Sequence, residues 1–118
     1  MICVVDDDAS LLRALRRLLV AHGRSVQIFS SAEAFLEFEH RDRVDCLILD
    51  VHLKGLSGFD LHEQLTAGGA RIPVIIITAH DDAPTRERAR RNGVVEYLRK
   101  PFDDESLIGA LDRALGRP

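Results

Sequence analysis

The chain has 118 residues, of which 46% are hydrophobic and 30% are charged, and its formal net charge is −3. This length suits one domain, and the composition is not that of a disordered chain. A negative net charge argues against a general nucleic-acid binder, no apolar run could cross a membrane, and the first residues lack a signal-peptide layout. We therefore expect residues 1–118 to form a single cytoplasmic domain.

Short apolar runs alternate with helical patterns along the whole chain. The runs predict strands at 2–5, 26–29, 46–50, 73–78 and 94–98. The intervening segments predict helices at about 11–22, 30–38, 58–66, 81–92 and 103–115, with Gly23 and Gly93 as C-terminal stops. This alternation is typical of an α/β fold in which helices cover both faces of a parallel sheet. Cys3 and Cys46 lie within apolar runs, so we expect buried, free thiols.

The second helix has a local start signal. Ser30 is followed three residues later by Glu33, which is a capping-box pattern, and the helix would carry Phe35, Leu36 and Phe38.

The fourth helix is unusually polar. Its apolar side chains are Ala83, Pro84 and Ala89, which is a narrow stripe for anchoring a helix to a core. We expect it to be weakly held, and shorter or more mobile than the others. The alternative is a solvated face stabilised by pairs such as Glu87 with Arg91.

Polar side chains collect where the predicted strands end. They are Asp6, Asp7 and Asp8 after the first strand, Asp50 at the end of the third, Thr78 at the end of the fourth and Lys100 after the fifth. Ligands of open parallel sheets bind at the carboxyl ends of the strands, so these groups should meet at one edge. For Asp8, capping of the first helix is the better reading.

Carboxylates held close together repel unless a proton or a cation neutralises them. Oxygen ligands favour Mg²⁺, with Mn²⁺ as a substitute. An Asp carboxylate can also accept a phosphoryl group, whose oxygens Lys100 and Thr78 could contact. Lys100 stands out because 14 of the 16 basic residues are Arg, and Lys and Arg are not interchangeable beside a phosphate.

Five motifs in this order and spacing resemble receiver domains of two-component response regulators over the whole chain. They are VVDDD at 4–8, ILD at 48–50, Gly58, ITA at 77–79 and YLRKPF at 97–102. The stretches SAEAFL, GFDLHEQL and TAHDDAPT are most similar to the nitrogen-fixation-regulator branch. The resemblance implies a flavodoxin-like (βα)5 three-layer sandwich with sheet order 2-1-3-4-5.

The resemblance also implies roles for single residues. Asp50 would accept the phosphoryl group from a sensor histidine kinase, and Mg²⁺ would be held by Asp7, Asp50 and the backbone carbonyl of His52, with Asp6 acting largely through water.

The remaining implied roles concern the response to phosphorylation. Lys100 would pair with the phosphoryl group, and its bond to Pro101 would be cis. Thr78 and Tyr97 would form a switch pair that reports phosphorylation to an output partner or domain.

The chain departs from the family at three positions. Lys54 stands four residues after Asp50, where the family often has Pro, and is either a charge near the phosphate or an exposed lysine without effect.

His52 and His80 would flank the path of attacking water. They could make phosphate loss sensitive to pH between about 6 and 7.5, act as exposed loop residues without effect, or hold Mn²⁺ or Zn²⁺.

Three functions compete at this stage. The first is a phosphorelay receiver that catalyses only its own phosphorylation and dephosphorylation, with a DNA-binding output domain in a longer parent chain and a phosphorylation-dependent homodimer as further partners. The second is a constitutive interaction module, which loss of Lys100 or of an acidic residue would favour. The third is an aspartyl-phosphate phosphatase, but that class needs a second Asp where His52 stands.

A polar fourth-helix face argues against dimerisation there, and we expect neither nucleic acid nor membrane to bind this domain.

Overall fold

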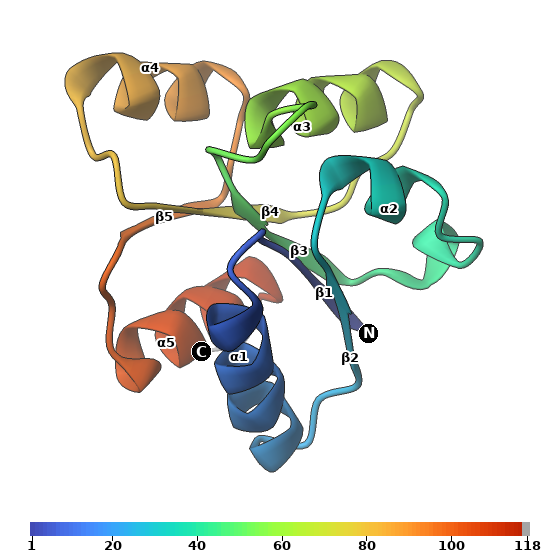
Figure 1. The fold of residues 1–118 in the computed structure, drawn as a ribbon, viewed down its shortest axis with the longest axis vertical. Coiled ribbons are helices and arrows are strands. Elements are labelled where there is room, and N and C mark those ends of the chain that lie inside the picture. Colours follow the sequence, from blue (N-terminus) through green and yellow to red (C-terminus); the bar gives the residue numbers. More distant parts are fainter. Residues whose placement is uncertain (117–118) are drawn as a thin grey trace.

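The computed structural model describes residues 1–116, so the last two residues of the predicted domain lie outside the described residues. One parallel sheet runs in the order β2-β1-β3-β4-β5. Its strands are β1 (Ile2–Val5), β2 (Val26–Phe29), β3 (Cys46–Asp50), β4 (Val74–Thr78) and β5 (Glu96–Arg99). Helices α1 (Ala9–Ala21) and α5 (Asp104–Ala114) cover one face, and α2 (Ala32–Leu36), α3 (Gly58–Ala67) and α4 (Ala83–Arg91) cover the other (Figure 1). The predicted sandwich and strand order are confirmed.

The three central strands are shielded from water on both faces, as expected for parallel strands covered by helices. Every residue of β1, β3 and β4 is buried. One core cluster lies under α2, α3 and α4, and the other lies under α1 and α5. In the register, Val5 pairs with Leu49 and Asp50 pairs with Ile77, so the strands end at a common edge. None of the described helices is long and apolar enough to cross a membrane.

Both cysteines are buried and free, as predicted. Burial raises the pKa of Cys3 to about 11 and that of Cys46 to about 12. Both thiols therefore stay protonated at neutral pH.

Helix α2 begins one residue later than the capping-box pattern predicts. The cap is Ser31, whose hydroxyl accepts the N–H of Ala34 at 3.0 Å, and not Ser30. Glu33 makes no capping box, because its carboxylate instead accepts the N–H of Leu56 at 3.2 Å. Leu56 lies in the loop between β3 and α3. Phe38 lies beyond the helix end but still packs against Phe29, with ring centroids 5.2 Å apart.

Strand β5 begins two residues later than predicted. The N–H of Val94 bonds to the carbonyl of Ala89 and so continues the turn that leaves α4 through Gly93, which has a φ of +72°. Apolar Val94 therefore belongs to this turn, whereas the N–H of Val95 already donates to the carbonyl of Val74 in β4 at 2.9 Å. The strand runs on to Arg99 instead of ending at 98.

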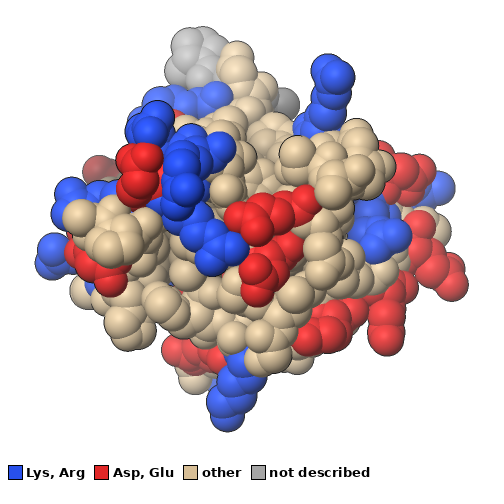
Figure 2. Space-filling model, turned by 90° about the horizontal axis from the view of Figure 1, so that it is seen from above, with Lys and Arg blue, Asp and Glu red and all other residues tan. Residues whose placement is uncertain are grey.

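Helix α4 buries only Ala89, in agreement with its narrow apolar stripe. We expected α4 to be shorter or more mobile than the other helices: the first alternative is wrong, because α4 has 9 residues and α2 has 5, and the second stays a prediction. Seen from above, the face that carries α4 shows its basic side chains directly beside carboxylates (Figure 2). This arrangement indicates that charge pairs, more than apolar burial, hold α4 in place.

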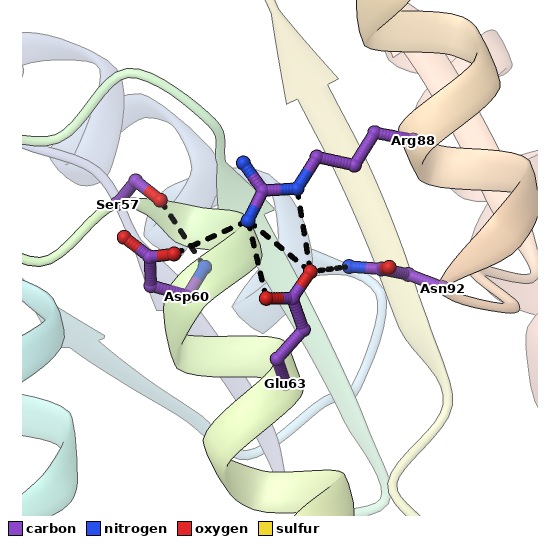
Figure 3. Close-up of polar contacts among 5 residues, drawn as sticks. All are labelled: Ser57, Asp60, Glu63, Arg88 and Asn92. Atoms are coloured by element: carbon purple, nitrogen blue, oxygen red, sulfur yellow. Dashed lines mark hydrogen bonds and ion pairs between the residues drawn. The ribbon is translucent and has the colours of Figure 1, made fainter.

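Arg88 is the main link between α4 and α3 (Figure 3). Its Nη2 lies 3.2 Å from Asp60 Oδ1 and 3.1 Å from Glu63 Oε1, and its Nε donates to Glu63 Oε2 at 3.3 Å. The guanidinium carbon also lies 4.9 Å from the ring centroid of Phe59, and Asn92 adds a hydrogen bond to Glu63 at 2.9 Å. A two-pronged pair that also stacks on an aromatic ring is stronger than an isolated surface pair.

We expect Arg88→Ala to speed amide hydrogen exchange across α4 about five- to tenfold and to leave α1 unchanged, because the link to α3 is lost. Arg91→Ala is the matched control, since Arg91 lies in the same helix and has only one pair, at 4.0 Å from Glu87. Equal exchange in the two variants would contradict this role for Arg88.

Candidate functional site

Three carboxylates meet at the carboxyl edge of the sheet. Asp6 and Asp7 follow β1, and Asp50 ends the neighbouring strand β3. One oxygen of each lies within 4.8 Å of the others. Asp6 and Asp50 are buried, whereas Asp7 is exposed. The predicted acidic site is therefore assembled, with one side open to solvent.

Lys100, the residue directly after β5, closes this cluster. Its Nζ donates to Asp6 Oδ2 at 2.7 Å and lies 3.4 Å from Asp50 Oδ1. Its backbone N–H donates to the carbonyl of Thr78 at 2.7 Å, and its bond to Pro101 is cis, as the resemblance implies. The ammonium of Lys100 thus lies between two buried carboxylates, Asp6 and Asp50, which are far from it in the sequence.

The charges at this site perturb one another. Burial, and next the charge of Asp6, raise the pKa of the Asp50 carboxyl, while Lys100 opposes them. Burial alone would lower the pKa of Lys100, but its hydrogen bond to Asp6 and the charges of Asp50 and Asp6 outweigh burial and raise it. Lys100 therefore stays charged, and the cluster keeps a deficit of positive charge that a cation would relieve.

Asp8 does not join the cluster through its side chain. Its carboxylate caps α1 by accepting the N–H groups of Ser10 and Leu11 at 3.0 and 3.2 Å, as predicted. Its own N–H donates to Asp6 Oδ1 at 2.9 Å. The start of α1 therefore also orients one carboxylate of the site.

Gly58 presses against the backbone of Asp50. A Cβ built on Gly58 would lie 2.1 Å from the carbonyl oxygen of Asp50, a distance that no side chain can occupy. The N–H of Gly58 also donates to Val51 at 3.0 Å. The start of α3 thus fixes the position of Asp50, which gives a physical reason for glycine at this point of the motif.

The two predicted switch residues are held by separate contacts. Thr78 is fully buried, and its hydroxyl accepts the N–H of His80 at 2.9 Å. Tyr97 is partly buried and donates its hydroxyl hydrogen to Asp81 at 3.2 Å. Burial and this carboxylate raise the pKa of Tyr97 to about 12. Asp81, which also pairs with Arg86 at 3.0 Å, was missed from sequence because its partner is 16 residues away.

His52 and His80 lie in contact on the two loops that border the cluster. Their ring centroids are 4.1 Å apart and their planes meet at 61°. Both side chains are exposed, as is Lys54. The structure therefore brings together the two histidines expected to flank the site, and their effect on phosphate lifetime stays a prediction.

The arrangement offers oxygen ligands for a hard cation, a buried carboxylate that can act as a nucleophile, and an ammonium beside it. A divalent cation would offset the carboxylate repulsion, and the open side at Asp7 gives it access. This set of groups suits phosphoryl transfer to Asp50.

Comparisons with known proteins agree with this chemistry. Residues 2–112 match the family model described as response regulator receiver domain. Response regulator protein TodT of Pseudomonas putida strain F1 is 43% identical over 115 residues, which are 98% of this chain and 51% of TodT. Transcriptional regulatory protein FixJ of Azorhizobium caulinodans is 39% identical over 97% of this chain and 54% of its own length. The crystal structure titled FixJ-N has a TM-score of 0.89 and 34% identity, covering 99% of this chain and 94% of that one.

The chain spans about half the length of these curated relatives. The match to FixJ supports the predicted branch.

The raised pKa of Asp50 predicts a stability effect. The folded chain binds the Asp50 proton more tightly than the unfolded chain does, so this group's contribution to stability falls as pH rises from the ordinary Asp value, about 3.9, through the raised value. We expect Asp50→Asn to raise the Tm at neutral pH, without divalent cations, by about 3–6 °C. Calorimetry in chelator measures this, with Asp45→Asn, at the exposed residue just before the same strand, as control. A lower Tm for Asp50→Asn would contradict it.

The close approach of Gly58 gives a second prediction. Gly58→Ala should lower the free energy of unfolding by about 3 kcal/mol, because the new methyl group forces Asp50 or α3 to move. Gly68→Ala is the control, since its Cβ would make ordinary contacts, the nearest at 3.5 Å. Denaturant unfolding of both variants tests this, and a similar small loss for both would show that the contact at Gly58 relaxes freely.

Proposed function

The chain belongs to the response regulator receiver domain family, and from that premise we propose that residues 1–118 form one receiver domain that is phosphorylated on Asp50. The carrying observation is the buried pair of Asp6 and Asp50 bridged by Lys100 at the carboxyl edge of the sheet. Asp50 is the carboxylate that ends a central strand and has Lys100 within 3.4 Å.

Mg²⁺ is the cation that these residues fit best, with Mn²⁺ as a substitute, because the three groups of the cluster are all carboxylates. Asp7, Asp50 and the backbone carbonyl of His52 would hold it, and Asp6 would act largely through water. When bound, the ion would supply positive charge beside the oxygens of the transferred group. The acidic cluster and its charge deficit support this assignment.

In the proposed reaction, an oxygen of Asp50 attacks the phosphorus of a kinase phosphohistidine. The new P–O bond forms as the P–N bond breaks, and the imidazole leaves with the electron pair. Lys100, now hydrogen-bonded to Asp6, is close enough to turn its ammonium toward the phosphoryl oxygens. The domain turns over no separate substrate in this scheme.

Phosphorylation would be reported through Thr78 and Tyr97. Thr78 would leave the N–H of His80 for a phosphoryl oxygen, and Tyr97 would leave Asp81 and turn inward. The change would be read by an output domain. FixJ is named a transcriptional regulatory protein, and this chain matches 54% of it, which supports a DNA-binding output domain in a longer parent. The proposal places the domain in the cytoplasm with a sensor histidine kinase as its phosphoryl donor.

Two other functions have less support. A phosphatase with an aspartyl-phosphate intermediate needs a general acid two residues after the nucleophile, where this chain has His52. A constitutive interaction module has no need for the intact set of Asp6, Asp7, Asp50 and Lys100.

Incubation with acetyl phosphate and Mg²⁺, followed by intact mass measurement, tests the proposal. We expect a gain of one phosphoryl group in the natural chain, none in Asp50→Asn and none in chelator. Asp45→Asn, at the residue just before β3, should still be phosphorylated. A gain of one phosphoryl group in Asp50→Asn would show that another residue is the acceptor.

A further inference from the structure

The β3–α3 loop, which joins strand β3 to helix α3, contains the backbone carbonyl of His52 that the proposed magnesium site uses. The first part of this loop is held by the sheet and the core. The N–H of Val51 donates to the carbonyl of Ile77 at 3.4 Å, and the carbonyl of Val51 accepts the N–H of Gly58 at 3.0 Å. The side chains of Val51 and Leu53 are also buried.

The remainder of the loop has much less support. Lys54 and Gly55 are exposed. Within residues 1–116, the backbone groups of residues 52–56 form no hydrogen bond with another backbone group. Their one hydrogen bond is to a side chain of another helix, because the N–H of Leu56 donates to Oε2 of Glu33 at 3.2 Å. This part of the loop therefore depends on Glu33.

Glu33 extends from a well-anchored helix. Helix α2 lies beside α3 on the same face of the sheet (Figure 1). Ser31 caps α2, and Ala32 and Phe35, on either side of Glu33, are fully buried. The ring of Phe35 also packs edge-on against Phe29, with centroids 5.3 Å apart. The backbone of Glu33 is thus fixed, and its exposed side chain reaches across to the loop.

Gly55 shows how closely the loop and Glu33 approach each other. The φ of Gly55 is +78°, in the left-handed region that side chains disfavour. A Cβ built on Gly55 would lie 2.8 Å from Oε2 of Glu33, which is the same oxygen that accepts the N–H of Leu56. The loop therefore curves around this oxygen, and glycine leaves the space that the oxygen occupies.

The sequence of the loop explains why it needs support from outside. Lys54 stands where a proline would fix φ at about −65°, and the next residue, Gly55, has the greatest backbone freedom of all residue types. Neither residue restricts the loop by itself. A hydrogen bond from α2 supplies the restriction that the local sequence lacks.

We propose that Glu33 is a positioning residue for the magnesium site, because by holding Leu56 it fixes the β3–α3 loop and the direction of the His52 carbonyl. This inference rests on the proposed function, which assigns that carbonyl to Mg²⁺. Leu53 is anchored by its side chain, but its peptide bond with His52 forms no hydrogen bond in the described chain. The orientation of that peptide therefore depends on how the chain beyond Leu53 is held.

The test is a Mg²⁺ titration of the unphosphorylated chain, followed by the NMR shifts of its backbone amides. Groups that orient a metal ligand commonly change metal affinity about 10–100-fold, and an exposed group should act at the lower end. We expect Glu33→Ala to bind Mg²⁺ about three- to tenfold more weakly than the natural chain. The amide of Leu56 should also exchange about fivefold faster, because its only partner is lost.

Two further variants separate the hydrogen bond from the charge. Glu33→Gln should keep most of the Mg²⁺ affinity, because the amide oxygen can still accept the N–H of Leu56. Glu37→Ala is the matched control, since Glu37 is the exposed last residue of the same helix and its carboxylate has no partner within residues 1–116. This control removes the same charge and should leave the affinity unchanged.

Gly55→Ala tests the contact from the side of the loop. The new methyl group would displace Oε2 of Glu33 and strain a positive φ, so Mg²⁺ binding should weaken. The strain is present whatever residue stands at position 33, but the displacement requires Glu33. Gly55→Ala combined with Glu33→Ala should therefore weaken binding by less than the product of the two single effects.

Three results would overturn the inference: natural affinity in Glu33→Ala, an equal loss in Glu33→Ala and Glu37→Ala, or independent effects of Glu33 and Gly55. If the natural chain still binds Mg²⁺ and accepts phosphate on Asp50, the proposed function stands in each case. A natural chain that binds no Mg²⁺ would reject the metal assignment, and this inference with it. Thermal unfolding verifies that each variant folds, and Glu33→Asp, whose shorter side chain should not reach Leu56, replaces Glu33→Ala if needed.

Discussion

The structure depends on the burial of two carboxylates side by side at the end of buried central strands. Asp6 and Asp50 are both removed from water, and their repulsion must be offset within the fold. The single ammonium of Lys100 does this from just beyond another strand, at 2.7 and 3.4 Å. Because two negative charges face one positive charge, the site is incomplete as it stands and favours a group that adds positive charge. This imbalance is the physical basis for assigning metal and phosphoryl chemistry here.

The backbone around Asp50 determines how a change at the site could travel. Gly58 leaves no space between α3 and the carbonyl of Asp50, so a displacement of the acceptor strand must move the start of α3. Asp60 and Glu63, on the following turns of α3, hold α4 through Arg88. A contiguous set of contacts therefore joins Asp50 to α4 and is separate from the pair formed by Thr78 and Tyr97.

The sequence predicted most of the sheet because its signals are local. Runs such as 46–50 are apolar throughout, and Asp8 caps the helix that follows it, so neither depends on distant residues. The errors arose where a local signal had a distant competitor. Glu33 matched a capping box but bonds to Leu56, and Val94 belongs to a turn closed by Ala89.

The site residues were predictable because the parallel topology places strand ends at one edge. The partners that position other residues were not, since nothing local links Arg88 to Glu63 or Tyr97 to Asp81.

The two polar helices show why charge counts alone do not locate an interface. Helix α4 has four arginines, and each pairs with a carboxylate of the same chain. Only Arg88 reaches another helix, because Arg90 and Arg91 pair with Glu87 of α4 itself. Helix α1 has three exposed arginines, Arg13, Arg16 and Arg17, and none of them forms an ion pair within residues 1–116. Surface charges that are already paired gain little from a new partner, whereas unpaired ones gain more. The unpaired charges are therefore the better guide to where this domain meets another molecule.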